Sequence, residues 1–314
     1  MKIGPFELRN NVFVAPMAGV TDRPYRQLCK TLGAGYAVSE MAASDPRLWN
    51  TIKTSRRLNH EGEMEPRAVQ IAGADPAMMV QSARFNVERG AQIIDINMGC
   101  PAKKVCNVFA GSALMADETL ALRIIDAVAN AVDVPVTVKM RTGPSVDHRN
   151  APRLARAAEQ AGAAMVVVHG RSRACGFTGL AEYDTVAEVK AALTVPVVAN
   201  GDIDSPEKAR RVLAYTGADA VMVGRAAQGR PWLMRQIAHY LATGELLPRP
   251  SYRQLLELMR THLRDHLAFY GEFTGVRTAR KHVGWYLRDF EGAGAFLAAF
   301  NRIECADAQM QALT

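Results

Sequence analysis

The sequence predicts an α/β protein, a (β/α)8 TIM barrel followed by a small C-terminal all-helical domain. Short runs rich in Val and Ile recur along the first three quarters of the chain. They lie about 30 residues apart, the size of a strand–helix repeat. Eight such runs are present, which is the number of strands in a TIM barrel. Beyond about residue 250 the apolar residues recur with the period of a helix.

The eight runs share local features that identify them as strands. Four follow a Gly-Ala pair, in GAGYAV from Gly33, GAQIIDI from Gly90, GAAMVVV from Gly162 and GADAVMV from Gly217. Glycine there suits the left-handed residue that closes a helix, and the apolar run suits a strand buried on both faces. VPVTVKM, VPVVAN, NVFVAPM and RAVQIAG complete the set. The strands are expected to begin near residues 12, 36, 68, 93, 135, 165, 196 and 219.

Helix starts and a linker complete the predicted organisation. Asp75-Pro76 and Ser205-Pro206 each place a capping residue before a proline at the first helical position. A doubly wound open sheet is the alternative, but no G-x-G-x-x-G follows the first run, and eight units would be many for that fold. The prolines of ELLPRPS indicate a linker. We therefore expect a catalytic barrel over residues 1–244 and a helical domain over residues 245–314.

Composition limits the functional classes. Of 314 residues, 38 are Lys or Arg and 31 are Asp or Glu, giving a net charge of +7, which is compatible with a polyanionic partner but does not require one. Five cysteines without a C-x-x-C pair argue against a disulfide framework and a structural zinc site, so no metal is expected. The start does not resemble a signal peptide, and no run reaches the ~18 apolar residues of a membrane helix. We expect a cytoplasmic monomer without a membrane partner.

The residues in or just after the last part of most predicted strands, mainly polar residues and glycines, lie at the end of a barrel where active sites lie. In chain order they are Pro16, Met17, Ala18, Gln70, Asn97, Cys100, Lys139, Arg141, His169, Arg171, Asn200, Gly201, Asp202, Gly224 and Arg225. Loops after the seventh and eighth strands often hold a phosphate through backbone N–H groups. Gly201 and Gly224-Arg225 fit that role, although two tight turns with a surface arginine would produce the same sequence pattern.

Lys139 lies within an apolar strand and is expected to be buried. A buried lysine needs an anionic partner or a reason to be neutral. A flavin ring, whose N1/C2=O edge gathers negative charge on reduction, would serve, and so would a Schiff-base role or a barrel carboxylate. Gln70 and Asn97 could hydrogen-bond a flat heterocycle or be satisfied core amides.

One cysteine stands apart from the others. Cys100 lies between Gly99 and Pro101 at a strand end, so a loop displays it. Cys106 follows only six residues later, and spacing alone does not exclude it as the reactive thiol. The remaining cysteines are expected to be inert and buried; they are Cys29, Cys175 and Cys305.

Ordered motifs along the whole chain resemble the tRNA-dihydrouridine synthase family, most closely its bacterial B-type. They are APMAGVTDRPYR at 15–26, VSEM at 38–41, VQIAG at 69–73, DINMGCPAKKV at 95–105, GSAL at 111–114, VKMRTG at 138–143, VHGRSR at 168–173, VVANGDI at 197–203 and VMVGRAAQGRPW at 221–232. ARKHVGWYL at 279–287 is similar to the family's helical domain. The second thiol, Cys106, departs from the expected pattern.

The resemblance implies tightly bound FMN, with NADPH as electron donor and NADH possible in its place. It also implies that Cys100 is the general acid. The implied FMN site consists of Pro16, Met17, Ala18, Gln70, Lys139, His169, Asn200, Gly201, Asp202, Gly224 and Arg225.

The implied reaction reduces the C5=C6 bond of a uridine in the tRNA D-loop. C6 is the electrophilic end of that bond, so reduced flavin can deliver hydride from N5 to C6, and a proton from Cys100 must reach C5. The uridine has to leave its stack, so the enzyme needs contacts with the surrounding RNA. Candidate tRNA contacts are Asn97, Lys103, Lys104, Arg141, Arg171 and Arg173 at the rim, and Arg277, Arg280, Lys281 and Arg288 on one helical stripe.

Three other functions remain open from the sequence. The first is an FMN barrel reductase that acts on a free small molecule. The second is a lyase that forms a Schiff base on Lys139. The third is a non-catalytic RNA-binding module on a barrel. Fold alone does not decide among them.

Overall fold

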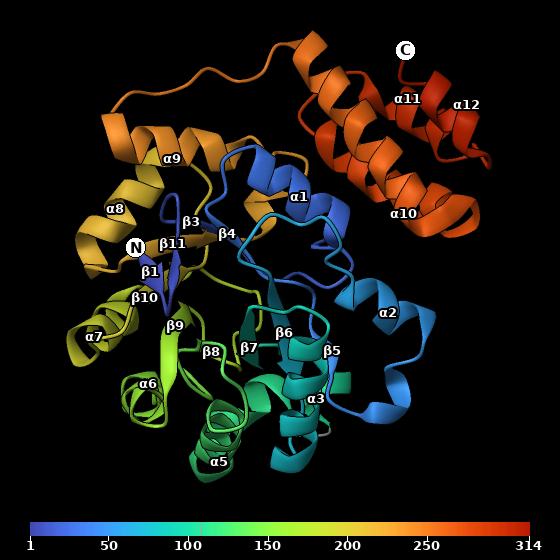
Figure 1. Ribbon diagram of the computed structural model, residues 1–314. Helices are drawn as coiled ribbons and strands as arrows, with labels where there is room; N and C mark the ends of the chain where they lie inside the picture. Colours follow the sequence, from blue (N-terminus) through green and yellow to red (C-terminus); the bar gives the residue numbers. More distant parts are fainter. Residues whose placement is uncertain (108) are drawn as a thin grey trace.

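The computed structural model describes residues 1–107 and 109–314, and these form a closed parallel sheet surrounded by helices (Figure 1). The strand order is β4-β3-β11-β10-β9-β8-β7-β6-β5. The strands are β3 (Val12–Val14), β4 (Tyr36–Ala37), β5 (Ala42–Ala43), β6 (Ala68–Ala72), β7 (Ile93–Met98), β8 (Val136–Arg141), β9 (Ala163–His169), β10 (Val197–Asn200) and β11 (Ala220–Val223). A parallel bridge between Val38 and Ala68 joins the β4 segment to β6. The sheet therefore closes on itself, which confirms the TIM barrel and excludes the open sheet.

Helices follow the strands in the order that the repeat predicts. They are α1 (Arg23–Thr31), α2 (Ile52–Leu58), α3 (Pro76–Glu88), α4 (Lys103–Cys106), α5 (Glu118–Ala129), α6 (Ala151–Gln160), α7 (Asp184–Ala192), α8 (Pro206–Thr216) and α9 (Leu233–Thr243), with short 3-10 turns at Pro46–Leu48, Gly111–Ala116 and Arg225–Ala227. Both predicted caps are present. The Asp75 carboxylate accepts from Met78 N at 2.8 Å, and the Ser205 hydroxyl accepts from Lys208 N at 3.1 Å.

An N-terminal hairpin closes one end of the barrel, a feature that the sequence analysis did not predict. Its strands are β1 (Lys2–Ile3) and β2 (Phe6–Glu7), paired antiparallel. Ile3 is fully buried and packs with the side chains that fill the barrel interior, among them Phe13, Met165 and Met222. Because this end is filled, the opposite end, where the strands have their C-terminal residues, is left to form the site.

The C-terminal residues form a helical unit with its own apolar core. It contains α10 (Tyr252–Tyr286), α11 (Ala293–Phe300) and α12 (Ala306–Gln311). Gly271 has φ 72° and ψ 170°, which breaks α10 into two segments. Leu263 of the first segment and Val283 of the second belong to the same core. Figure 1 shows this unit beside α1, joined to α9 by an extended linker. The boundary at residue 244 stays a prediction.

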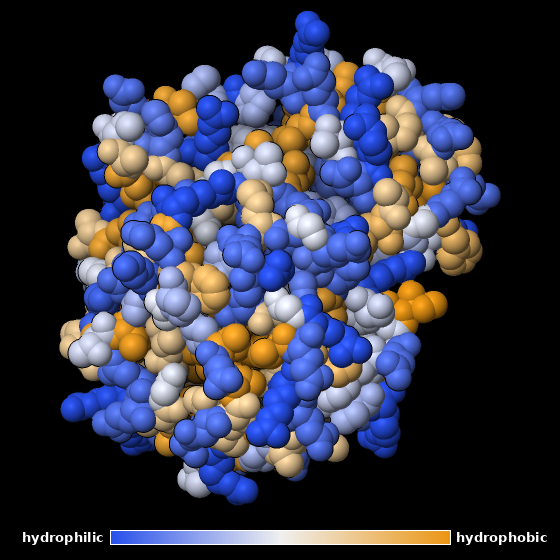
Figure 2. Space-filling view, in the orientation of Figure 1, coloured by the Kyte–Doolittle hydropathy of each residue, from blue (hydrophilic) through white to orange (hydrophobic). Residues whose placement is uncertain are grey.

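The surface in the orientation of Figure 1 mixes polar and apolar residues. Figure 2 shows hydrophilic residues over much of this face, with smaller apolar patches between them. Across the residues that the structure describes, no helix combines the length and the apolar character needed to cross a membrane.

Candidate active site

A cavity of about 1500 Å³ lies at the C-terminal ends of the barrel strands. Typical small-molecule pockets measure ~300–1,000 Å³, so this one has room for more than one ligand. Every residue predicted to bind the cofactor lines it, as do Asn97, Cys100, Arg141, Arg171 and Arg173. The barrel thus brings together side chains that the sequence spreads over more than 200 positions.

A chain of hydrogen bonds runs across the floor of the cavity and ends at the Cys100 loop. Asp95 accepts from Thr137 Oγ1 and Gln70 Nε2, both at 2.6 Å. Gln70 Oε1 in turn accepts from Asn97 Nδ2 at 2.7 Å. Asn97 Oδ1 then accepts from the backbone N–H of Cys100 at 3.0 Å. Asn97 therefore positions the cysteine loop, and its amide groups are engaged within the protein.

Lys139 is buried between two strands and faces the cavity. Its ammonium donates to Asn200 Oδ1 at 2.9 Å, and Asn200 Nδ2 donates to Met222 O at 2.7 Å. Burial lowers the pKa of Lys139 to about 8, while Asp95 acts in the opposite direction. A lysine near its pKa in a polar cavity can donate hydrogen bonds to an electron-rich ligand edge at little cost.

His169 ends β9 among several cations. Burial lowers its pKa to about 2, and the positive charges of Lys139, Arg141 and Arg171 add to that effect. The ring is therefore neutral at physiological pH, and it offers one donor and one acceptor to a ligand rather than a charge.

The arginines at the rim divide into buried and exposed ones. Arg171 is 3% exposed, and it donates to Asp202 Oδ2 at 2.7 Å and to Gly179 O at 2.6 Å. Arg141 is 1% exposed, and its donors go to the carbonyls of Gly99, Ser172 and Gly176. These two guanidiniums brace the rim loops.

Arg225 lies on the open side of the cavity. Its side chain is 58% exposed and 3.4 Å from Asp202 Oδ1. Burial alone would raise the pKa of Asp202, but its hydrogen bonds with Ala181 N and Arg171 lower it on balance, so the carboxylate is ionised. The exposed Arg225 and the partly buried Arg173 therefore leave positive charge available to an anionic group at the cavity mouth.

The two thiols of the loop have different surroundings. Cys100 is half-buried and lines the cavity. Burial raises its pKa, against the opposing effect of a backbone hydrogen bond from Ala102. Cys106 Sγ instead lies 3.5 Å from Cys100 O and 3.6 Å from Ser112 Oγ, and it is not among the residues that line the cavity. Of the two thiols, Cys100 is the one that a bound molecule can reach.

Comparisons with known proteins agree with this arrangement. A family model described as dihydrouridine synthase (Dus) matches residues 13–314. The tRNA-dihydrouridine synthase B of Pseudomonas aeruginosa is 60% identical over 309 residues, which cover 98% of this chain and 93% of that protein. The protein of the same description from Vibrio cholerae is 55% identical over 313 residues, covering 100% and 97%. The chain belongs to the dihydrouridine synthase family. This membership confirms the predicted class of enzyme, a flavin-dependent oxidoreductase.

Two solved structures share the barrel of this dihydrouridine synthase. A 2-naphthoyl-CoA reductase complex matches with a TM-score of 0.58 and 13% identity, over 78% of this chain and 52% of that one. A histamine dehydrogenase from Rhizobium sp. 4-9 matches with a TM-score of 0.58 and 12% identity, over 84% and 50%. The chain spans about half the length of each. Identities this low show likeness of fold alone.

Several residues of the synthase cavity were missed by sequence reasoning. Asp95, inside the DINMGCP motif, does not line the cavity but anchors the hydrogen-bond chain beneath it, and the motif alone did not indicate that role. Lys208 and Arg211 of α8 line the cavity. They follow the Ser205 cap by three and six residues, and a helix start after the seventh strand could have indicated them. Phe177, 57% exposed, lies under the Arg225 guanidinium at 5.6 Å.

The predicted tRNA contacts of the synthase are dispersed. Arg277 is exposed, but Lys281 Nζ donates to Gly19 O and Arg280 donates to Ile303 O at 3.1 Å. Arg288 is exposed and donates to Gln228 O. Not every side chain of this stripe is free to contact tRNA, because Lys281 and Arg288 form hydrogen bonds between the helical unit and the barrel. The side chains of Lys103 and Lys104 lie outside the described part of the structure.

The expectation for the other cysteines was wrong in part. Cys29 is fully buried, and burial raises its pKa to about 12. Cys175, however, is only partly buried, and Cys305 is exposed at the start of α12. Both lie in short connections, where the sequence offers no apolar period that would report burial.

Proposed function

We propose that this enzyme reduces the C5=C6 bond of a uridine in the tRNA D-loop, with tightly bound FMN and NADPH as electron donor, and with Cys100 as general acid. The convergence of the predicted cofactor residues and Cys100 on one cavity supports this assignment most directly. The close relatives that are described as tRNA-dihydrouridine synthases support the substrate.

The residues present fit a flavin phosphate. At one end, Arg225, Lys208 and Arg211 surround a mouth with backbone N–H groups near Gly201 and Gly224. Gly201 has φ 124°, and a Cβ there would lie 2.7 Å from Ala181 Cβ and 3.1 Å from His169 Cδ2. Glycine lets the backbone approach in this conformation, as phosphate loops require.

The opposite part of the cavity fits a flat heterocycle. Lys139, Asn200 and Gln70 line the barrel floor, and after the hydrogen bonds they make within the protein each nitrogen still has a hydrogen to donate. Neutral His169 adds a donor and an acceptor without adding charge. The cavity volume of about 1500 Å³ leaves space beside such a ring for a nucleobase that has left its stack.

The chain's own part in the reaction is proton delivery. A reduced flavin held there would supply hydride for uracil C6. Cys100 holds the proton that C5 needs, and its raised pKa keeps the thiol protonated at neutral pH. Asn97 fixes the loop that presents this thiol, through its hydrogen bond with the Cys100 N–H.

The direct test is to incubate the purified protein with NADPH and tRNA that lacks modifications. The tRNA is then digested, and dihydrouridine is sought by mass. Its appearance is the expected result. A yellow protein that NADPH bleaches, without product in the tRNA, would indicate a small-molecule reductase instead. A colourless protein that binds tRNA would indicate a non-catalytic role.

A further inference from the structure

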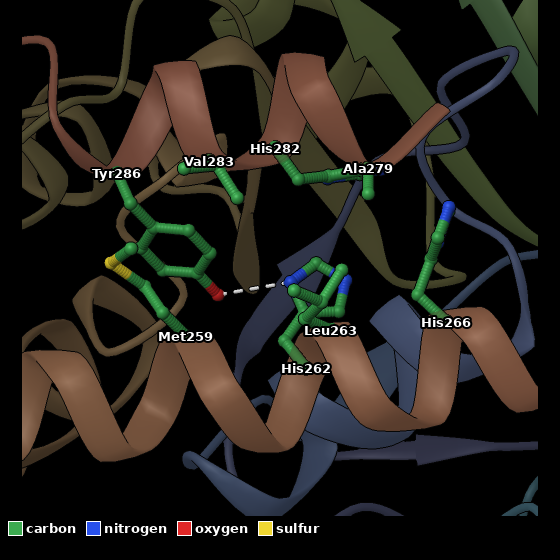
Figure 3. Close-up of a pocket in the computed structure, with 8 residues that line it drawn as sticks. All are labelled: Met259, His262, Leu263, His266, Ala279, His282, Val283 and Tyr286. Atoms are coloured by element: carbon green, nitrogen blue, oxygen red, sulfur yellow. Dashed lines mark hydrogen bonds between the residues drawn. The ribbon is translucent and has the colours of Figure 1, made fainter. Parts of the chain in front are cut away.

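Three buried histidines face one another in the helical unit, and we refer to them as the histidine cluster: His262, His266 and His282. The first two lie four residues apart on the first segment of α10, and the third lies on the second segment (Figure 3). They are 2%, 2% and 5% exposed. One ring nitrogen from each lies within 4.8 Å of the other two. Figure 3 shows the two segments side by side with these rings between them.

Each ring has a buried nitrogen without a hydrogen-bond partner among the described residues. His262 Nδ1 lies 3.1 Å from the Tyr286 hydroxyl, and His266 Nε2 lies 2.7 Å from Thr278 Oγ1. Within the described residues, His262 Nε2, His266 Nδ1 and His282 Nε2 are buried without a hydrogen-bond partner. Buried polar groups almost always have one. In metal sites, a hydrogen bond on the far ring nitrogen, such as His262 and His266 have here, orients the ligating histidine.

A carboxylate from the barrel approaches the cluster. Asp22 caps α1 through Oδ1, which accepts from Tyr25 N at 3.0 Å. Its other oxygen, Oδ2, is buried and lies 3.7 Å from His266 Nδ1, and a side-chain hydrogen bond with Tyr270 lowers the pKa of this carboxyl against the effect of burial. Burial raises the pKa of Asp22 to about 6. The three imidazole nitrogens thus lie within 4.8 Å of one another, and the Asp22 carboxylate from the barrel lies beside one of them, that of His266.

We propose that the histidine cluster and Asp22 bind one divalent transition-metal ion of the zinc class. Imidazole and carboxylate are preferred ligands of Zn²⁺, which binds four of them tetrahedrally at ~2.0–2.1 Å, so neighbouring donor atoms lie about 3.4 Å apart. The present spacing of the histidine nitrogens, up to 4.8 Å, is wider than this, so metal binding requires the three rings and Asp22 to rotate toward a common centre. This site goes beyond the proposed function and does not rest on it.

The enclosure of the site indicates a structural ion. The space between the histidines is about 10 Å³, lined also by Met259, Leu263 and Tyr286. It has no room for a substrate beside a metal, and four protein ligands would leave no open coordination position. An ion there would join the two segments of α10 to each other and to the start of α1.

The protonation state of the rings is compatible with metal binding. Burial lowers the pKa of His262 to about 4 and that of His266 to about 3, and Lys281 acts in the same direction. Metals bind the neutral ring. Lys281 is the nearby cation that would oppose an ion, but its ammonium is directed to Gly19 O.

A single buried water is the competing occupant, because a space of ~10–15 Å³ suffices for one. The first measurement is therefore elemental analysis of tag-free holoenzyme after incubation with Zn²⁺ and removal of the excess. We expect close to one zinc per chain. Zinc-edge X-ray absorption should then give nitrogen and oxygen ligands at about 2.0–2.1 Å, without the sulfur shell at about 2.3 Å that Cys100 or Cys106 would produce.

Two variants and a matched control test the assignment. His266→Gln removes one ligand, and Asp22→Asn removes the carboxylate but keeps an oxygen able to cap α1. The control is His148→Gln, at an exposed histidine of the barrel. After dialysis against a chelator, each of these two variants should retain no more than about a tenth of the zinc that wild type retains. Added Zn²⁺ should raise the Tm of chelator-treated wild type and of His148→Gln on the order of 5 °C, but not that of Asp22→Asn.

Three outcomes would overturn the proposal. The first is wild-type protein that retains less than about a tenth of an equivalent of zinc, which would leave a buried water as the occupant. The second is a sulfur shell in the absorption spectrum. The third is unchanged zinc content in the folded variants. If His266→Gln does not fold, Asp22→Asn and the wild-type spectrum still decide. FMN absorbance checks the barrel separately, so loss of zinc with retained flavin is distinct from failure of the proposed function.

Discussion

At the scale of single residues, the proposed acid owes its position to groups that never touch a ligand. Asp95 accepts a hydrogen bond from Gln70, and Gln70 accepts one from Asn97. Asn97 in turn accepts one from the backbone N–H of Cys100. The links among Asp95, Gln70 and Asn97 are buried, so each of their polar atoms must be satisfied by the next. The rigidity of the thiol therefore depends on the whole chain of hydrogen bonds rather than on its own loop.

Replacement of the proposed acid should separate the two halves of the reaction. Cys100→Ala should still bind FMN and accept electrons from NADPH, because the flavin residues are unchanged. Formation of dihydrouridine in tRNA should fall ~10²–10⁴-fold, the usual contribution of general acid catalysis. Stopped-flow bleaching of the flavin measures the first step, and mass analysis of digested tRNA measures the second.

The neighbouring thiol provides the matched control. Cys106→Ala should keep near-normal dihydrouridine formation, since Cys106 does not line the cavity. The reverse result, a normal Cys100→Ala and an inactive Cys106→Ala, would transfer the acid role to Cys106.

The raised pKa of Cys100, caused first by burial, predicts how the rate of dihydrouridine formation depends on pH. The wild-type rate should decline only above the usual thiol pKa of about 8.5, and Cys100→Ala should lack that decline.

The predictability of single residues depended on whether their neighbours in space were also neighbours in sequence. Strand-end residues such as Lys139 and Asn200 could be predicted, because the barrel places all strand ends together. The histidine cluster could not. His262 and His266 are spaced for one helical face, but His282 joins them only through the reversal at Gly271. Nothing in the local sequence states where that second segment packs.

At the scale of elements, the strands were predictable because both faces are buried. The expected starts near 93, 135 and 196 compare with observed starts at Ile93, Val136 and Val197. The hairpin of β1 and β2 was not predicted, because two-residue strands are too short to show a periodic pattern of apolar residues. The second barrel strand is split into β4 and β5, and its short pieces pair with different neighbours.

The loop after β10 should be sensitive to a single methyl group. Gly201→Ala places a Cβ 2.7 Å from Ala181 Cβ at a φ of 124°. We expect a destabilisation of about 1–3 kcal/mol and roughly tenfold weaker flavin binding. Urea unfolding and fluorescence titration with FMN measure the two effects.

Strain alone should not weaken flavin binding. Gly217 ends α8 with φ 66°, and the nearest atom to an added Cβ is Lys190 Cγ at 3.8 Å. Gly217→Ala should therefore cost about 1 kcal/mol of stability with unchanged FMN affinity. Equal flavin affinity in both variants would show that the Gly201 loop does not approach the cofactor.

At the scale of the whole molecule, the helical unit is tied to the barrel at several points. Lys281 donates to Gly19 O, Arg288 to Gln228 O, and Arg56 to Tyr270 O at 2.7 Å. Gln228 itself lines the cavity, and Gly19 directly follows the lining residue Ala18. A partner bound to the helical unit would thus be held at a fixed place relative to the cavity mouth, which a tRNA substrate requires if one uridine is to enter.

Charge reversal on the helical unit should weaken tRNA binding without affecting the cofactor. Arg277 is the exposed member of the predicted stripe on the second segment of α10, and its guanidinium lies 3.9 Å from the centre of the Phe273 ring. Phosphate contacts dominate such affinities, so Arg277→Glu should raise the Kd for tRNA roughly threefold or more at 0.1 M salt and lower the salt slope by about 1. The control is Arg123→Glu, exposed on α5, which Figure 1 places across the barrel from α10. That reversal changes the net charge equally, so the same loss of affinity in both variants would mean that net charge, and not this surface, governs binding.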